Sequence, residues 1–270
     1  MDSSVPSSRN CFPSPASVLK RSWSLSEHSD IANPAPPAAV FFDLDGTILD
    51  WQTGMEESWL AACEAHVDGP LVAAKLHEAI RLHRTWFWED PERARRGRMD
   101  LDAASREIVT RAFADMGIES RDLARGVADD YRARRIAEIA PYPGAVETLE
   151  AFRRRGIPMA LITNGDGRHQ RRNIERYGLA SYFDCIVIEG EFGVGKPDER
   201  VFHHALAAVA GAASTTWMVG DSLEADIAPA VALGMHAVWV DAERAGLPSA
   251  PLAQPHRIVQ AIRELAPSAS

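Results

Sequence analysis

The strongest constraint on the fold is a regular alternation of strand-like and helix-like segments between residues 157 and 240. The strand-like segments are IPMALIT, DCIVI, TTWMV and HAVWV, and the helix-like segments between them are RHQRRNIERYG, DERVFHHALAAVA and EADIAPAVALG. A further helix-like segment, AVETLEAFRRR, precedes the first of these strands. Repeated β–α units predict a parallel sheet that carries helices on both faces. We therefore expect an α/β fold.

A second short strand is predicted upstream, and it ends in two carboxylates. The apolar run at residues 38–42 is followed by Asp43 and Asp45, and Gly46 then breaks the pattern. The period of two in a strand places both aspartates on the same side. Two carboxylates side by side repel each other, so the pair indicates a bound cation, an unusual pKa or an exposed turn.

Polar residues also follow the other predicted strands. Thr163 and Asn164 lie in LITNG, Lys196 lies in GVGKPD, and Asp221 and Asp226 lie in GDSLEAD. The carboxyl ends of parallel strands meet along one edge of a sheet, where ligands bind. Carboxylates, a hydroxyl group and one ammonium group at such an edge predict a site for a metal ion and an oxyanion.

Known chemistry connects these groups. Mg²⁺ prefers oxygen ligands, and Asp43 and Asp221 are the expected ones. A carboxylate can attack phosphorus and form an aspartyl-phosphate if cations neutralise the phosphoryl oxygens. We expect Lys196 to supply that positive charge.

The remaining groups fit the same reaction. Asp45 could donate a proton to the leaving oxygen and later take one from water. The Thr163 hydroxyl and the backbone N–H groups of Asn164 and Gly165 could hold the phosphoryl oxygens, because they lie at the start of a predicted helix.

Residues 52–140 follow a different pattern, which indicates a helical insertion. Apolar residues recur there at helical spacing, and strand signals are almost absent; examples are Leu101, Ala104, Ile108, Phe113, Met116, Leu123, Val127 and Tyr131. The insertion follows the Asp43 strand, so it is expected to cover a cleft at the sheet edge. Its segment WFWEDPERARRGRMD, residues 86–100, is the place where we expect substrate specificity, although Trp86 and Phe87 also fit a helical core.

Composition limits the class of protein. A formal net charge of −9 argues against a nucleic-acid partner, and no apolar run is long enough for a membrane span. The three cysteines are far apart and lack metal-site spacing, which favours a reducing compartment, and we expect a cytoplasmic protein.

The N-terminal segment, residues 1–37, is rich in Ser and Pro and is predicted to be a disordered tail. A Ser-rich transit peptide is the alternative, but Asp2, Glu27 and Asp30 disfavour it.

Four motifs in the order DLDGT, LITNG, GKPD and GDSLEAD resemble those of the haloacid dehalogenase superfamily of hydrolases, over residues 38–242. The resemblance implies a Rossmann-like, doubly wound parallel core formed by residues 38–51 and 141–270. It also implies that residues 52–140 form an inserted helical cap of the C1 type.

The resemblance assigns roles as well. It implies that Asp43 is the nucleophile, Asp45 the acid/base, and Thr163 and Lys196 the phosphoryl-binding residues. It further implies that Asp221, a carboxylate oxygen of Asp43 and the backbone carbonyl of Asp45 bind Mg²⁺, with Asp226 in a supporting position.

The expected activity is Mg²⁺-dependent hydrolysis of a small-metabolite phosphomonoester, of the sugar phosphate or nucleotide type. A phosphomutase uses the same core residues and remains an alternative. A 2-haloacid dehalogenase is disfavoured, because displacing halide needs no proton donor such as Asp45. A non-enzymatic binding protein would be marked by loss of Asp43 or Lys196, and both are present. The sequence specifies no oligomeric state.

Overall fold

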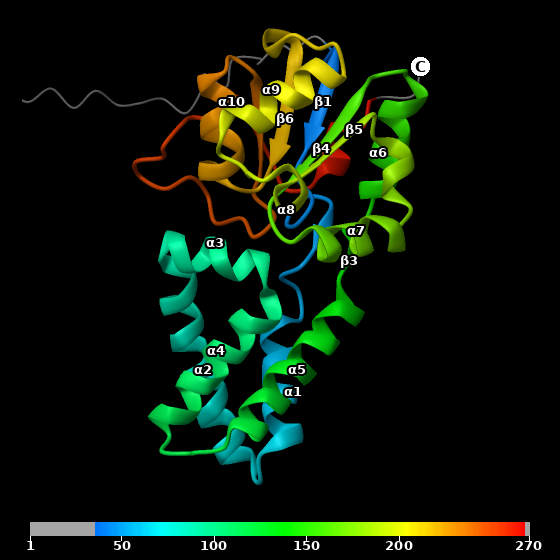
Figure 1. Cartoon of the computed structure of the whole chain (residues 1–270). Coiled ribbons are helices and arrows are strands. Elements are labelled where there is room, and N and C mark those ends of the chain that lie inside the picture. Colours follow the sequence, from blue (N-terminus) through cyan, green and yellow to red (C-terminus); the bar gives the residue numbers. More distant parts are fainter. Residues whose placement is uncertain (1–35, 268–270) are drawn as a thin grey trace, which may run out of the picture. The chain divides into compact units, whose positions relative to one another are not determined.

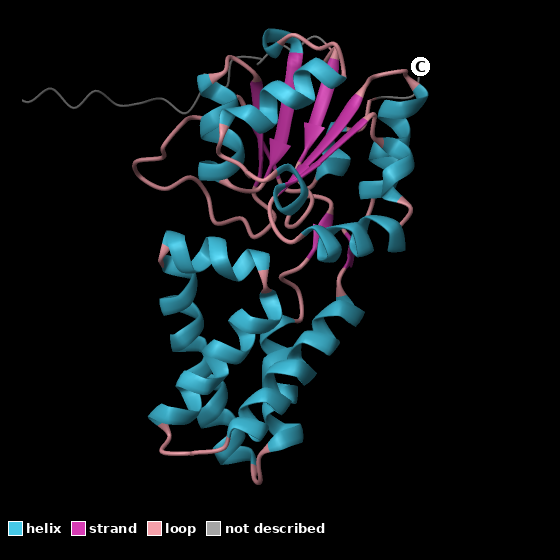
Figure 2. Cartoon of the chain, viewed as in Figure 1, coloured by secondary structure: helices cyan, strands magenta, loops and turns pink. Residues whose placement is uncertain are grey.

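The computed structural model of the chain describes residues 36–267. Strands and helices alternate in its core, and a block of helices follows the first strand (Figures 1 and 2). The predicted disordered tail, residues 1–37, lies outside the described residues except for its last two positions. Within residues 36–267, no helix combines the length and the apolar character needed to cross a lipid bilayer.

The core is built on one six-stranded sheet in the order β5-β4-β1-β6-β7-β8, in which all neighbouring strands are parallel. The strands are β1 (Ala39–Phe42), β4 (Met159–Thr163), β5 (Cys185–Ile188), β6 (Thr216–Gly220), β7 (His236–Val240) and β8 (Arg257–Val259). The first strand lies inside the sheet and the chain winds outward in both directions, which is the Rossmann order. The prediction of an α/β, Rossmann-like doubly wound core is confirmed.

Helices cover both faces of this sheet (Figure 2). Phe41 and Phe42 are successive residues of β1 and point to opposite faces, so they belong to two separate hydrophobic clusters. Phe42 packs edge-on against Phe152 of α6, and Phe41 lies in the cluster of Phe202 of α9. The core helices are α6 (Ala145–Arg154), α7 (Gly167–Arg176), α8 (Glu189–Phe192), α9 (Glu199–Ala208) and α10 (Ala228–Ala232), with short helical turns η1 (Leu179–Tyr182), η2 (Ala213–Thr215), η3 (Leu223–Ile227) and η4 (Ile262–Leu265).

The helical insertion enters and leaves the core through a two-stranded antiparallel ribbon in which Leu49 faces Pro141. The ribbon strands are β2 (Leu49–Asp50) and β3 (Ala140–Pro141), and the helices are α1 (Met55–His66), α2 (Pro70–Glu89), α3 (Pro91–Met99), α4 (Leu101–Asp115) and α5 (Arg121–Glu138). These helices bury a hydrophobic cluster of their own, which includes Trp59, Ile108 and Val127. A separate core is what an independently packed domain needs, so we retain residues 52–140 as the proposed cap boundaries.

Several elements were not predicted from the sequence, namely the short strands β2, β3 and β8 and the short helix α8, and one predicted helix has a different form. Strand β8 was not anticipated, because its three residues alternate between an exposed and a buried position too briefly to form a pattern. The single helix expected at residues 224–234 is instead the π-helical turn η3 followed by α10. Pro229 lacks a backbone N–H, so the regular hydrogen-bond ladder cannot run unbroken through this segment.

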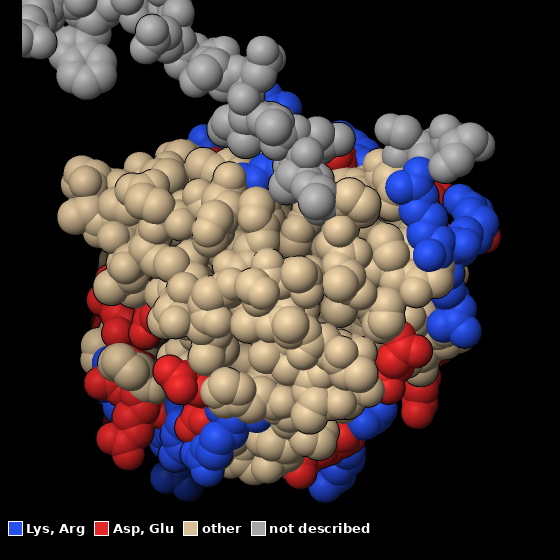
Figure 3. All heavy atoms as spheres, turned by 90° about the horizontal axis from the view of Figure 1, so that it is seen from above, with Lys and Arg blue, Asp and Glu red and all other residues tan. Residues whose placement is uncertain are grey.

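One face of the core carries its charges at the margins. Seen from above in Figure 3, the centre of this face is uncharged, and Lys or Arg side chains lie beside Asp or Glu side chains near its edges. Although the formal net charge of the chain is −9, the described residues of this face form no single continuous acidic patch.

Candidate active site

The central position of β1 brings three predicted site residues together. Strand β1 pairs with β4 on one side and β6 on the other, so the ends of these strands are neighbours. Asp43 follows β1, Thr163 ends β4 and Asp221 follows β6. The Asp43 backbone N–H donates to Val219 O of β6 at 2.9 Å, which extends the ladder by one bond and fixes the Asp43 backbone.

Lys196 lies between two carboxylates from distant parts of the chain. Its Nζ donates to Asp43 Oδ1 and to Asp226 Oδ1, at 2.6 Å in each case, and all three side chains are buried. Burial on its own would lower the pKa of the Lys196 ammonium, but the charges of Asp226 and Asp43 outweigh it and hold that pKa above its ordinary value. Lys196 therefore remains a cation beside Asp43 across the physiological pH range.

Asn164 positions the loop that carries Lys196. Its side-chain oxygen accepts a hydrogen bond from Lys196 N at 2.7 Å, and its side-chain amide donates to Lys196 O at 2.8 Å. The expectation for Gly165 was a free N–H for phosphoryl oxygens. In the structure this N–H donates to Glu189 Oε2 at 2.9 Å, so a phosphoryl group would have to replace that bond.

Asp45 is held by a residue that sequence reasoning missed. Gln170 Nε2 donates to Asp45 Oδ2 at 2.7 Å, to Thr163 Oγ1 at 2.9 Å and to Asn164 O at 2.8 Å. Burial raises the pKa of Asp45 to about 6. The hydrogen bond from Gln170 opposes this rise, whereas repulsion from Asp43 adds to it. A carboxyl group with this pKa can hold or release a proton near neutral pH, as acid/base chemistry requires.

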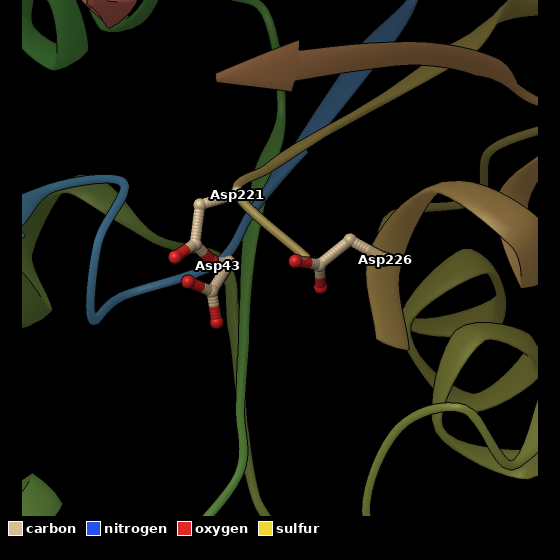
Figure 4. A group of neighbouring side chains, drawn as sticks. All are labelled: Asp43, Asp221 and Asp226. Carbon is tan, nitrogen blue, oxygen red and sulfur yellow. The ribbon is translucent and has the colours of Figure 1, made fainter. Parts of the chain in front are cut away.

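Asp43, Asp221 and Asp226 form a carboxylate cluster, in which one oxygen of each lies within 4.8 Å of the others. Figure 4 shows the Asp43 and Asp221 carboxylates side by side, with Asp226 reaching toward them from the helical segment after β6. Burial, followed by repulsion from Asp43 and Asp226, raises the pKa of Asp221 from 3.8 to about 8. With all three carboxylates ionised, the cluster would carry more negative charge than Lys196 neutralises.

The carboxylate cluster fits a hard divalent cation. Asp43 Oδ2 is buried and has no hydrogen-bond partner among residues 36–267, and a buried unpaired carboxylate oxygen is costly. Both oxygens of Asp226 are occupied, one by Lys196 and the other by Ser222 N at 3.0 Å. Asp43 and Asp221 thus offer the open oxygens, and Asp226 supports Lys196 and the loop.

A cavity of about 550 Å³ lies next to these groups, and residues of both the core and the helical insertion line it. From the segment 86–100, Trp88 and Arg98 reach the cavity. Phe87 is instead buried in the core of the helical insertion, and the Trp86 ring lies between the guanidinium groups of Arg93 and Arg111, at 3.9 and 4.0 Å. Only part of the expected specificity segment therefore faces the site.

A family model of haloacid dehalogenase-like hydrolases matches residues 37–234. The chain belongs to this family. The family assignment drawn from the four motifs is therefore confirmed, and the Asp43, Thr163, Lys196 and Asp221 positions all fall inside the matched region of this haloacid dehalogenase-like hydrolase.

Individual relatives match this chain over different shares of its length. A phosphoserine phosphatase from Thermus thermophilus is 39% identical over 161 residues, which cover 59% of this chain and 63% of that protein. The N-acylneuraminate-9-phosphatase of Rattus norvegicus is 28% identical over 247 residues, which cover 84% of this chain and 91% of that protein. Among solved structures, the magnesium-bound HAD-hydrolase YfnB from Bacillus subtilis superposes with a TM-score of 0.66 at 23% identity, over 85% of this chain and 97% of that one. This last similarity supports the fold.

Gln170 and Glu189 are the site neighbours that the sequence did not reveal. Gln170 lies in α7 on the same buried stripe as Asn173 and Ile174, and a polar residue on such a stripe needs hydrogen-bond partners. The helical spacing of Gln170 with Asn173 and Ile174 is the sequence feature that could have indicated a buried Gln170. Glu189 directly follows β5, which is a strand end at the same sheet edge, and its carboxylate is buried.

Gly46 makes room for Asp221. Its φ is 88°, and a Cβ at this position would lie 2.1 Å from Asp221 Oδ2. Gly69 has nearly the same φ, 87°, but no atom lies within 4 Å of a Cβ there. Comparing the two glycines therefore separates the strain of a positive φ from displacement of the Asp221 carboxylate.

Gly46→Ala is expected to cost clearly more stability than Gly69→Ala. The control suffers only the strain of a side chain at positive φ, of the order of 1–3 kcal/mol, whereas Gly46→Ala must also displace Asp221. The Gly46→Ala protein should therefore require a higher Mg²⁺ concentration than the wild type for half-maximal activity. Chemical denaturation and Mg²⁺ titration of both variants measure this, and equal losses with unchanged metal requirements would contradict the assigned contact.

Proposed function

We propose that this hydrolase is a Mg²⁺-dependent phosphatase that cleaves a small-metabolite phosphomonoester through an aspartyl-phosphate. The observation that carries the proposal is Asp43 itself. One of its oxygens accepts from the Lys196 ammonium at 2.6 Å, and the other is buried and unpaired among the described residues. The Asp43 carboxylate also belongs to the cluster with Asp221 and Asp226. Family membership and two relatives that are named phosphatases support it.

In this proposal Asp43 is the nucleophile. A carboxylate oxygen of Asp43 forms the bond to phosphorus as the bond from phosphorus to the leaving alcohol oxygen breaks. Asp45 donates its proton to that oxygen, and Gln170 holds Asp45 in place for the transfer. Asp45 then takes a proton from a water molecule, whose oxygen attacks the phosphorus and releases phosphate and the free Asp43 carboxylate.

The charge of the phosphoryl group is met by the residues around Asp43. We propose that Lys196, the Thr163 hydroxyl and the N–H groups of Asn164 and Gly165 bind its oxygens. Mg²⁺ would be held by the carboxylates of Asp43 and Asp221 and by the backbone carbonyl of Asp45. Its positive charge would offset the repulsion between these carboxylates and the phosphoryl oxygens. Asp226 keeps Lys196 oriented and charged.

The proposed substrate is a small phosphorylated metabolite, and the proposed location is the cytoplasm. Cys63 and Cys185 are free thiols in the described part of the chain, which agrees with a reducing compartment.

The test is phosphate release from a panel of sugar phosphates, nucleoside monophosphates and phosphorylated hydroxy acids, with Mg²⁺ and with excess chelator. We expect metal-dependent release of inorganic phosphate from at least one class. Phosphorus NMR of the products separates hydrolysis from mutase activity, because a mutase yields an isomerised sugar phosphate. Halide release from 2-haloacids without any phosphate release would replace the proposal by the dehalogenase alternative.

A further inference from the structure

The two sides of the cavity carry opposite charge. On the core side the ionisable lining residues are aspartates, together with Lys196 and His169. On the side of the helical insertion they are four arginines, Arg84, Arg98, Arg132 and Arg135, and no described Asp or Glu of the insertion lines the cavity. In the proposed function the core groups bind the phosphoryl group, which leaves these arginines to contact the rest of the substrate.

In two of the four arginines, both terminal nitrogens already donate to the protein. Arg135 donates to Thr53 O, to Glu138 Oε2 and to Trp51 O, and its side chain is 3% exposed. Arg84 donates to Glu56 Oε1 at 2.5 Å and to the sulfur of Met55 at 3.0 Å. These two residues stabilise the insertion, and neither keeps a terminal nitrogen without a bond to the protein.

Arg132 is different, because only one edge of its guanidinium is used. Its Nε donates to Asp102 Oδ1 at 3.0 Å, and its two terminal nitrogens have no hydrogen-bond partner among residues 36–267. The side chain is 11% exposed, and its terminal nitrogens are not among the buried unpaired atoms, so a ligand in the cavity can reach them. A guanidinium edge with two free N–H groups matches the two oxygens of a carboxylate or phosphate.

Arg132 also lies near the catalytic groups of the core. Burial, followed by the charges of Arg132 and Arg172, lowers the pKa of His169 to about 4. His169 precedes Gln170, the residue that holds Asp45. The free edge of Arg132 is thus within electrostatic reach of the helix that positions the proton donor.

Arg98 is the second arginine with unused donors. Its Nε is buried without a hydrogen-bond partner among the described residues, and it lies 3.5 Å from Glu189 Oε2, which already accepts from Gly165 N. Its backbone carbonyl accepts from Asp166 N at 3.1 Å, so the end of α3 is attached to the loop after β4. This contact places Arg98 beside the proposed phosphoryl-binding loop.

We propose that the leaving group of the substrate carries a second anionic group, a carboxylate or a second phosphate, which Arg132 binds with Arg98 in support. The inference rests on the proposed phosphatase function and names its substrate class. The cavity also has apolar and aromatic walls, from Leu101, Ile108 and the stacked rings of Trp59 and Tyr131. A short organic chain or ring with an anion at each end would fit this arrangement.

The experiment compares matched phosphomonoesters: ω-carboxyalkyl phosphates with two to five carbons, alkyl phosphates of equal length, and the corresponding alkanediol bisphosphates. We expect the carboxylated or bisphosphorylated ester of the best length to exceed its neutral partner in kcat/KM by about 10-fold or more, since hydrogen bonds to charged groups contribute strongly. Comparing the carboxyalkyl phosphates with the bisphosphates shows whether the second anionic group is a carboxylate or a phosphate.

Arginine variants locate the effect. Arg132→Gln is expected to reduce the ratio of kcat/KM for charged over neutral esters by about 10-fold or more, and Arg98→Gln by a smaller factor. Arg125→Gln is the control on the same helix as Arg132, and Arg96→Gln is the control on the helix of Arg98. Both control side chains are exposed and paired with surface carboxylates, so the ratio should stay at its wild-type value.

Binding to the Asp43→Asn protein in Mg²⁺ gives a readout that needs no turnover. The probes are ω-carboxyalkyl phosphonates, alkanediyl bisphosphonates and neutral alkyl phosphonates of two to five carbons, measured by calorimetry. Tighter binding of a charged probe that Arg132→Gln removes supports the proposal even if no ester of the panel is cleaved. Equal binding of charged and neutral probes, or a preference that survives Arg132→Gln, overturns it. Hydrolysis of neutral and charged esters at equal kcat/KM would also overturn it while leaving the phosphatase function intact.

Discussion

Asp43→Asn is expected to lower kcat by at least about a thousandfold while the protein stays folded. The amide of asparagine is a far poorer nucleophile than a carboxylate, and it also removes one of the two negative partners of Lys196. The fold should survive, because Lys196 keeps its bond to Asp226 and the Asp43 backbone bond to Val219 does not involve the side chain. Loss of one charge from the carboxylate cluster also relieves repulsion on Asp221.

Phosphate release measured on the best ester of the panel, together with far-UV circular dichroism and thermal unfolding, tests this expectation. Glu224→Gln is the matched control, since it is the same carboxylate-to-amide change at an exposed position between Asp221 and Asp226. It should retain wild-type kcat. An Asp43→Asn protein that turns over at even a tenth of the wild-type rate, after contaminating phosphatase has been excluded, would remove Asp43 from the nucleophile role.

Much of the candidate site could be predicted because it is governed by sheet geometry. Asp43, Thr163 and Asp221 each lie at the end of a strand, and parallel pairing brings such ends together whatever the rest of the chain does. Lys196 was also expected at this sheet edge, because it lies in the loop segment that follows β5 and α8. Its bonds to Asp43 and Asp226 span 153 and 30 residues of sequence. The polar residue types at these positions then limited the chemistry.

The residues that were missed depend on packing between elements, which leaves no periodic signal. Gln170 contacts Asp45 across 125 residues, and only the docking of α7 on the sheet edge brings the two together. In the sequence, Arg132 could not be told from Arg135, whose terminal nitrogens are both bonded, because both are arginines on one helix. Partner availability is a property of the folded state, and it separates a binding residue from a structural one.

Removing divalent cations is expected to abolish phosphate release and to make the stability of the protein depend on pH above neutrality. Without a cation, the pKa of Asp221 in the folded state is about 8, against 3.8 as the ordinary value. Between these values the folded state holds a proton that the unfolded state has released. The free energy of unfolding therefore falls as pH rises toward 8, by an amount of the order of 1 kcal/mol per pH unit.

The window between pH 6.5 and 8 lies above the pKa values of about 6 to which Asp45 and Asp226 are raised, so Asp221 dominates the slope there. The pKa of His169 is lowered to about 4, so His169 acts in the opposite direction, but only below its ordinary value of 6.5. Thermal unfolding in excess chelator should show a midpoint that drops by a few degrees across the window, whereas saturating Mg²⁺ should raise the midpoint and flatten its pH dependence.

Asp221→Asn provides the decisive comparison for the metal site. In chelator at pH 8 this variant should unfold at a higher temperature than the wild type, because it removes a buried charge that Asp43 and Asp226 repel. With Mg²⁺ the order should reverse, since the variant has lost one of the two open metal-binding carboxylates. Glu224→Gln should follow the wild type in both conditions. If Asp221→Asn is less stable than the wild type in chelator, the carboxylate cluster is held together by protein contacts alone, and its assignment as the metal site fails.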